Sequence, residues 1–156
     1  MANPAQLARL RDVGLLILRV GLGMAFLVHG WPKITGGPKF WTGLGSVFPV
    51  PPAVVWGFIG ALIEFGGGLL LIAGLLFRPI CLLLFFQMLV ALFLVHLKHG
   101  DPFWVYSHAL EDAVVFLGLV FIGPGRLSAD ESVWGTDPAP PGFLVGLERP
   151  PLVPRK

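Results

Sequence analysis

The chain has 156 residues, of which 55% are apolar and 13% charged, and its mean hydropathy is +0.81. A soluble domain is roughly 45–50% apolar and about 25% charged, so this chain would expose more apolar surface than water tolerates. The apolar content excludes a disordered chain. A net charge of +2 without a basic run excludes nucleic acid as a partner. The composition therefore indicates one integral membrane domain whose first partner is the lipid bilayer.

Four apolar stretches predict four transmembrane helices, at about residues 13–29, 53–77, 79–97 and 108–123. The first three match the length of about 20 residues that a bilayer core requires. The fourth is short and fits only if part of residues 103–107 adds an interfacial turn. Arg19 interrupts the first stretch and no small-x-small cleavage site follows it, which favours a retained helix over a signal peptide. The fold class predicted is an all-α, up-down-up-down four-helix transmembrane bundle.

Lysine and arginine are distributed unevenly between the two sides of this bundle, which predicts its orientation. The side with both termini carries Arg9, Arg11, Arg78, Arg126, Arg149, Arg155 and Lys156, whereas the other carries Lys33, Lys39 and Lys98. We therefore expect both termini in the cytoplasm, and a multi-pass protein of the inner, or plasma, membrane.

The segments outside the spans differ in character. A transmembrane domain is expected over residues 1–126, with only Arg78-Pro79 between the second and third spans. Residues 30–52 form a long outer loop, rich in glycine, proline and aromatics, that we expect to lie on the membrane surface as a lid. Residues 127–156 are proline-rich and predict a largely extended cytoplasmic tail, in which residues 143–147 form the one apolar patch.

Two ionisable residues lie near the middle of their spans, where each charge costs about 2.5–3.5 kcal/mol. Arg19 lies ten residues inward from His29, and Glu64 lies eleven residues inward from Ala53. Equal depth on neighbouring helices predicts an Arg19–Glu64 ion pair. Small residues share the Glu64 face and let helices approach closely, so the carboxylate should point into the bundle. They are Gly57, Gly60, Gly67 and Gly68.

A second polar layer lies near the outer ends of the spans and contains His29, His96, His99, His108 and Glu111. With Arg19 and Glu64, we interpret His29, His96 and Glu111 as the lining of a polar pocket that binds a quinone or phenol head. Gln87 lies nine residues from His96, on the opposite face of a regular helix, so both can face one pocket only if that helix is distorted. Gln87 is therefore interpreted as a helix–helix hydrogen bond, and Asp101 and Asp112 as interfacial charges.

Other cofactors are less favoured. His29 and His96 lie at matching depth, a geometry that permits haem, but the sequence contains no second matched pair, no His-x-x-x-His and no thiolate cluster. We expect no metal, and treat a b-type haem protein as a further alternative. Cys81 is the only cysteine, which excludes electron relay through a dithiol within the chain.

The ordered set of these segments resembles the DoxX family of small four-span membrane proteins. The resemblance is carried by Leu18-Arg19-Val20-Gly21-Leu22-Gly23, Phe26-Leu27-Val28-His29-Gly30, Lys33, Ile63-Glu64-Phe65-Gly66-Gly67-Gly68, Gly74-Leu75-Leu76-Phe77-Arg78, His96, Glu111 and Gly123-Pro124-Gly125-Arg126. By this resemblance, Arg19, His29, Glu64, His96 and Glu111 look like the polar positions of the family.

The resemblance implies a membrane subunit or accessory of an oxidoreductase system, with soluble redox enzymes as cytoplasmic partners. No catalytic motif identifies a self-contained enzyme. The function favoured is thus a quinone- or phenol-interacting membrane subunit. The alternative is a non-enzymatic scaffold or small-solute carrier that recruits redox partners, and the sequence leaves open whether copies of the chain form a homo-oligomer.

Overall fold

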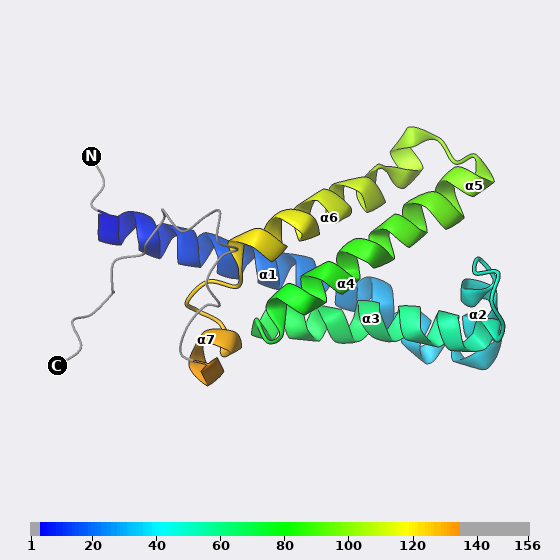
Figure 1. Ribbon diagram of the computed structural model, residues 1–156, viewed down its shortest axis with the longest axis horizontal. Helices are drawn as coiled ribbons and strands as arrows, with labels where there is room; N and C mark the ends of the chain where they lie inside the picture. The colour runs from blue at the N-terminus through cyan, green and yellow to red at the C-terminus, as the bar shows by residue number, and fades with distance from the viewer. Residues whose placement is uncertain (1–3, 135–156) are drawn as a thin grey trace.

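The structure is a computed structural model that describes residues 4–134, and within this range the chain is helical and contains no strand. The elements in chain order are α1 (Pro4–Thr35), α2 (Gly37–Gly45), α3 (Ala53–Ala73), α4 (Phe77–Val90), η1 (Ala91–His96), α5 (Leu97–His99), α6 (Phe103–Ile122) and α7 (Ala129–Trp134). Figure 1 shows α2 at one end of the bundle and α7 toward the other. We call these the α2 end and the α7 end.

Four helices are long and apolar enough to cross a membrane: α1, α3, α6 and the continuous segment Phe77–His99 that joins α4, η1 and α5. They alternate in direction along the chain, so the all-α four-helix bundle predicted from the sequence is confirmed. Helix α1 packs along α3, and α4 packs along α6. The side of the membrane on which each end lies stays a prediction.

The first helix is longer than its apolar stretch suggested. Helix α1 continues past His29 and through Pro32 to Thr35. Proline is tolerated in membrane helices because nearby groups satisfy the freed backbone atoms. The last turn of the helix, after Pro32, has side-chain partners: the Thr35 hydroxyl donates to the Trp31 carbonyl, and the Trp41 indole donates to the Lys33 carbonyl, both at 2.8 Å. The extension brings Lys33 within the membrane-spanning helix.

The other spans also shift at their ends. Helix α3 stops at Ala73 because Gly74 adopts a left-handed conformation, φ +66°, and its N–H returns to the last turn. Helix α6 begins at Phe103, so residues 103–107 supply a full helical turn to the short fourth span. The third span continues to His99.

The segment between the first two spans is not only a loop. Residues 37–45 form helix α2, which begins with Pro38 in its first turn and packs on the start of α3. A Cβ on Gly57 would lie 1.8 Å from the Trp41 carbonyl oxygen, and one on Gly45 would lie 1.7 Å from the Ala53 carbonyl oxygen. The Trp41 and Phe58 rings also pack together in a tilted arrangement, with centroids 4.8 Å apart. Helix α2 is thus fixed against α3 by backbone contact.

Glycines also set the alignment of α1 with α3. A Cβ on Gly30 would lie 2.7 Å from the Phe65 nitrogen, and one on Gly68 would lie 2.8 Å from the Gly23 carbonyl oxygen. These close approaches fix the antiparallel register, in which Lys33 lies beside Glu64. Glu64 is buried, as its glycine stripe predicted.

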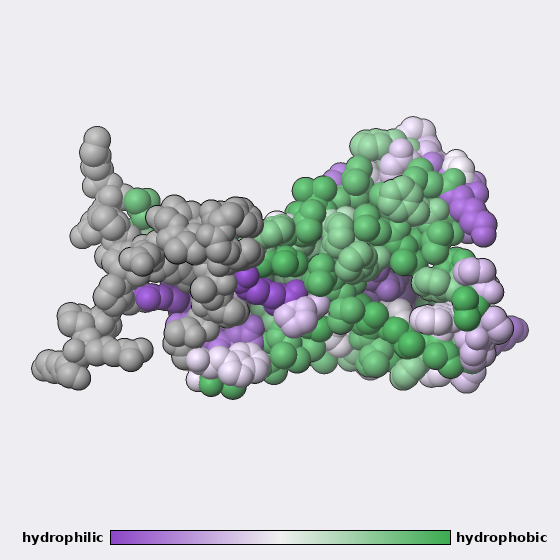
Figure 2. All heavy atoms as spheres, in the orientation of Figure 1, coloured by the Kyte–Doolittle hydropathy of each residue, from purple (hydrophilic) through white to green (hydrophobic). Residues whose placement is uncertain are grey.

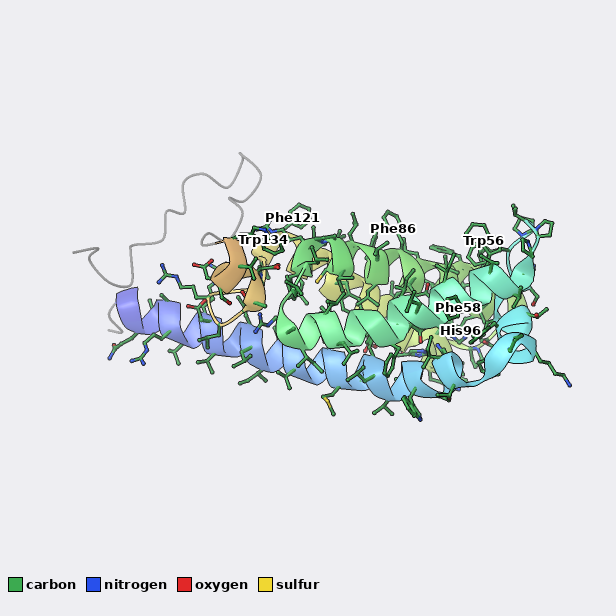
Figure 3. The ribbon with its side chains drawn as sticks, turned by 90° about the horizontal axis from the view of Figure 1, so that it is seen from below. Trp56, Phe58, Phe86, His96, Phe121 and Trp134 are labelled. Atoms are coloured by element: carbon green, nitrogen blue, oxygen red, sulfur yellow. The ribbon has the colours of Figure 1, made fainter. Side chains whose placement is uncertain are left out.

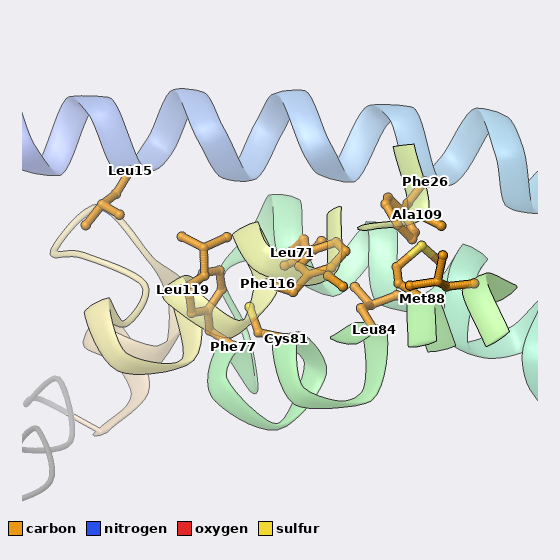
Figure 4. Close-up of a cluster of buried hydrophobic side chains, with 12 residues drawn as sticks. Leu15, Phe26, Leu71, Phe77, Cys81, Leu84, Met88, Ala109, Phe116 and Leu119 are labelled. Atoms are coloured by element: carbon orange, nitrogen blue, oxygen red, sulfur yellow. The ribbon is translucent and has the colours of Figure 1, made fainter. Parts of the chain in front are cut away.

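The apolar core fills the middle and the α7 end of the bundle. Figure 4 shows its cluster beneath α1, with contributions from α3, α4 and α6. Phe26 meets Phe116 edge to face, with ring centroids 5.1 Å apart. The fully buried members with the largest side chains are Phe77, Phe116, Leu71, Leu84, Leu119 and Cys81.

The α7 end is closed by polar contacts to the segment after α6. The buried Arg19 donates to the Leu127 carbonyl, and its guanidinium lies against Gly74. Asp130 caps the start of α4, accepting from Leu76 N–H at 2.7 Å and Phe77 N–H at 2.9 Å. Residues 127–130 therefore pack against the bundle, and residues 129–134 form a helix where an extended tail was expected. The rest of the predicted tail, with the patch at 143–147, lies outside the described residues.

The outer surface of the bundle is apolar. Figure 2 shows a broad hydrophobic belt over the spanning helices, with hydrophilic residues toward both ends. In Figure 3, Phe86, Phe121 and Trp134 lie along the side that faces away from α1. Phe86 is 54% exposed and Val114 is 65% exposed. Such a surface suits contact with acyl chains.

Candidate functional site

A cavity of about 610 Å³ occupies the α2 half of the bundle, above the apolar core. This volume is within the usual range of small-molecule sites, roughly 300–1,000 Å³. Phe26 and Met88 belong to both the core and the cavity, and so form its floor. Leu44 of α2 and Phe48, which follows α2, line the cavity at the α2 end. All four spanning helices contribute walls.

The central polar feature of the cavity is an ion pair between Lys33 of α1 and Glu64 of α3. The Lys33 ammonium donates to both carboxylate oxygens, at 2.7 Å to Oε1 and 2.5 Å to Oε2. The Glu64 side chain is 6% exposed, whereas that of Lys33 is 31% exposed. The Gln87 amide of α4 lies 3.4 Å from Oε1. The carboxylate is thus held from two sides, and the ammonium borders the open space.

This pair corrects the predicted Arg19–Glu64 ion pair, which is wrong. The depth of Arg19 was counted from His29, but α1 ends six residues later, at Thr35. At about 1.5 Å per residue, the error is about 9 Å. Arg19 consequently lies beside Gly74, ten residues along α3 from Glu64, and its bond is to the Leu127 carbonyl. Arg19 does not line the cavity.

A distorted helix brings Gln87 and His96 into the same cavity. Residues 91–96 form a π-helix, η1, between the α-helical segments α4 and α5. In a regular helix these two side chains would face opposite ways. The wider turn changes the angle between them, and both line the cavity. Such π segments recur at functional sites.

His96 is positioned by a neighbouring carboxylate. Its Nδ1 lies 2.8 Å from an Asp101 oxygen, and the Asp101 N–H donates to the His96 carbonyl. Its ring also meets the His108 ring edge to face, with centroids 5.5 Å apart. Asp101, interpreted from the sequence as an interfacial charge, therefore orients a cavity residue. His99 is exposed and lies outside the lining.

The wall between α1 and α6 is the more polar one. It carries His29, His108 and Asp112, of which Asp112 is half-buried and the two histidines are exposed. Glu111, the residue chosen from the sequence, is exposed and does not line the cavity. Of the five predicted site residues, the structure therefore brings together His29, Glu64 and His96, and it adds Lys33, Gln87, His108 and Asp112.

These side chains can both donate and accept hydrogen bonds inside largely apolar walls. Ammonium and amide donors lie beside carboxylate acceptors, and imidazoles can act as either. Within residues 4–134, no group of three or more histidine, cysteine, aspartate or glutamate side chains has the proximity that a metal ion requires. The arrangement suits an amphipathic organic molecule with a polar head, held at membrane depth.

The fold and the cavity define a multi-pass helical membrane protein with a polar site inside its bundle. A family model described as DoxX matches residues 14–97, and the chain belongs to this family. The match covers α3 and most of the first and third spanning helices, and it includes the polar cavity residues His29, Lys33, Glu64, Gln87 and His96.

Several bacterial membrane proteins are similar to the chain over most of its length. Inner membrane protein YqjF of Escherichia coli is 32% identical over 127 residues, which cover 78% of this chain and 93% of the relative. Inner membrane protein YphA of the same organism is 29% identical, with coverage of 77% and 90%. The uncharacterized membrane protein Rv3486 of Mycobacterium tuberculosis is 29% identical, with coverage of 74% and 78%. No solved structure matches the chain.

Proposed function

We propose that this protein binds a quinone or a related phenol in the cavity, and that it serves as a subunit or accessory of an oxidoreductase system in the bacterial inner membrane. The observation that carries the proposal is the convergence of polar side chains from all four spanning helices within apolar walls. Ligand sites commonly combine such walls with a few polar groups that fix orientation. The names of the two Escherichia coli relatives support the membrane assignment.

The polar groups match both redox forms of such a ligand. A quinone presents only acceptor oxygens, and the Lys33 ammonium and the Gln87 amide can donate to them. A hydroquinone or phenol presents hydroxyl donors, and Asp112 and the imidazoles of His29 and His108 can accept them. A cavity with both kinds of group can hold the ligand before and after proton transfer. The electron-transfer partner would be a separate redox enzyme, which we place on the cytoplasmic side.

The test is thermal stabilisation of the purified full-length protein by ubiquinone and menaquinone analogues with short side chains. At a free concentration of 100 times Kd, binding stabilises the folded state by about 2.7 kcal/mol. For a chain of this size, this corresponds to a rise in Tm of roughly 5–11 °C. No rise with any quinone, hydroquinone or phenol would end the proposal.

Variants connect the binding to the cavity. Lys33→Met removes a charged donor, and a hydrogen bond to a charged group contributes about 1.5–3 kcal/mol, so Kd should rise roughly ten- to hundredfold. Glu64→Gln should also weaken binding, because it releases Lys33 from its fixed position. The matched control is Glu111→Gln on the exposed face of α6, which should leave Kd unchanged. Each shift is measured against the ligand-free Tm of the same variant.

Haem is a second candidate, because His29 and His96 lie on different helices and line the same cavity. Two histidines from facing helices can ligate haem iron, and a carboxylate on the second ring nitrogen, as Asp101 is for His96, is common for ligating histidines. The absorption spectrum of the purified protein, reduced minus oxidised, distinguishes the two candidates. A colourless sample that binds quinone excludes haem as the ligand.

A further inference from the structure

The walls of the cavity differ in chemistry on its two sides. Between α1 and α6 the wall is polar, with His29, His108 and Asp112. Between α3 and the α4–η1 segment the polar members are Glu64, Gln87 and His96. The rest of this wall is apolar and consists of Trp56, Ile59, Gly60, Ile63, Val90, Ala91 and Val95. An amphipathic ligand would therefore have its polar head on one side and its apolar part on the other.

The apolar side coincides with the place where two helices separate. Helix α3 packs against α4, but it makes hardly any close backbone contact with η1. Figure 1 shows the α4–η1–α5 segment diverging from α3 toward the α2 end. On the α3 side of this divergence lies Gly60, where an added Cβ would lie 3.2 Å from the Gln87 amide nitrogen. From Gly60 toward the α2 end, the space between the two helices is part of the cavity, which Trp56 of α3 and Val95 of η1 both line; we call this space the gap.

This gap lies on the membrane-facing surface of the bundle. In Figure 2 the hydrophobic surfaces of α3 and of the α4–α5 segment flank a recess in which hydrophilic atoms are visible. Gly60 is seven residues from the start of α3, so the gap begins about 10 Å inside the helix end. This depth is within the nearer leaflet of a hydrocarbon core about 30 Å thick. We therefore infer that acyl chains, rather than water, border the opening.

We propose that the ligand is a membrane-resident quinone or phenol with a long apolar tail, which enters sideways from the bilayer between α3 and η1. Its head lies among Lys33, His29 and His108, and its tail leaves the cavity past Gly60 and Ala91 into the leaflet on the α2 side. The inference rests on the proposed function and makes it more specific. It selects lipid-soluble ligands over water-soluble ones, and it assigns η1 a role in holding the gap open.

Photo-crosslinking of the full-length protein in liposomes tests the path of the tail. One quinone probe carries a diazirine on the ring, and a second carries it on the first carbons of the tail. We expect the ring probe to label α1 and α6 near His29 and His108. The tail probe should label α3 over residues 56–63 and η1 over residues 91–95. Excess unlabelled quinone should suppress both, whereas labelling by an alkyl diazirine without a head should not be suppressed.

The outcomes separate this inference from the proposed function. If neither probe gives labelling that quinone suppresses, the proposed function fails. If the ring probe labels the cavity but the tail probe labels the space between α1 and α6, or α2, then the head site stands and the lateral entry between α3 and η1 is wrong.

A variant that narrows the gap provides an independent measurement. Ala91→Trp places a large ring at the cavity wall of η1, and overpacking of this kind should weaken binding of a long-tailed quinone about tenfold or more. A tailless benzoquinone should still raise the Tm of this variant. The control is Phe93→Trp, on the same π-helical segment but 56% exposed and outside the lining. Equal loss of both quinones in Ala91→Trp, with the control unaffected, would overturn the lateral path.

Discussion

The ion pair between Lys33 and Glu64 makes a quantitative prediction about stability. Removing one partner of a buried ion pair costs about 3–5 kcal/mol, because the other charge is left without compensation. Lys33 borders the cavity and its side chain is 31% exposed, so solvent screening reduces this cost. We therefore expect Lys33→Met to lower the free energy of unfolding by about 2–3 kcal/mol. For a chain of this size, Tm should fall by roughly 4–12 °C.

A double-mutant cycle isolates the pair itself. Glu64→Gln removes the carboxylate with little change in shape, and the combination of Lys33→Met with Glu64→Gln removes both charges. The loss of unfolding free energy in the double variant should be smaller than the sum of the two single losses, by about 1 kcal/mol or more. The assay is thermal unfolding in one detergent, followed by circular dichroism. The control Lys39→Met replaces an exposed lysine of α2 and should change stability by no more than about 0.5 kcal/mol.

A second double-mutant cycle distinguishes the Lys33–Glu64 pair from the Arg19–Glu64 pair that the sequence suggested. Arg19 lies beside Gly74, about 15 Å along α3 from Glu64. The losses of Arg19→Met and Glu64→Gln should therefore add within about 0.5 kcal/mol. Strong coupling between Arg19 and Glu64, together with additive behaviour of Lys33 and Glu64, would refute the observed register of α1 against α3.

Two further predictions concern the ends of the bundle. Asp130→Ala removes the cap from the first turn of α4, so it should lower the unfolding free energy by about 0.5–2 kcal/mol while quinone affinity, measured by titration, stays unchanged. Gly57→Leu cannot fit against the Trp41 carbonyl and should displace α2 from α3. We expect faster amide hydrogen exchange over residues 37–45, and unchanged exchange there would show that α2 is not held by this contact.

The inward orientation of Glu64 could be predicted because a helix has a fixed period. Glycines three, four and seven residues away share its face, and small residues mark close helix contacts in membranes. The structure places Gly60 against Gln87, Gly67 against Leu84 and Gly68 against α1. The glycine face of α3 thus packs against both α4 and α1, and Glu64, in the middle of this face, is buried between these helices.

The partner of Glu64 could not be found in the same way, because it depends on where a helix ends. Proline after His29-Gly30-Trp31 is typical of a helix end in a soluble protein, yet α1 continues through Pro32. The signal that was missed lies in Trp31 and Ile34, which continue the apolar pattern on either side of Lys33. Because α1 ends six residues later than the sequence suggested, the cation that pairs with Glu64 is Lys33 and not Arg19.

Two other differences come from rotation about a helix axis. Glu111 and Asp112 are adjacent, so their side chains point about 100° apart. The sequence favoured Glu111 for its spacing of three from His108, whereas the packing of α6 turns Asp112, at a spacing of four, toward the cavity. The π-helix of residues 91–96 is a further difference, because no local sequence pattern in this segment predicts it. Once this distortion is known, it explains why Gln87 and His96 line the same cavity.

Most contacts between the two helix pairs lie on the α7 side of the cavity, and Phe26 and Met88 belong to both the core and the cavity lining. Close glycine contacts join α1 to α3, and α4 packs along α6 as a second pair. The apolar core and the Asp130 cap join the two pairs near the α7 end. Because the contacts between the two helix pairs are concentrated near the α7 end, the pairs can diverge at the α2 end. The polar side chains of the cavity lie in this wider part, where they do not have to fit into a closely packed core. A lateral gap beside a membrane-depth ion pair is therefore compatible with a stable fold, since the apolar core and the Asp130 cap join the two pairs on the other side of the cavity.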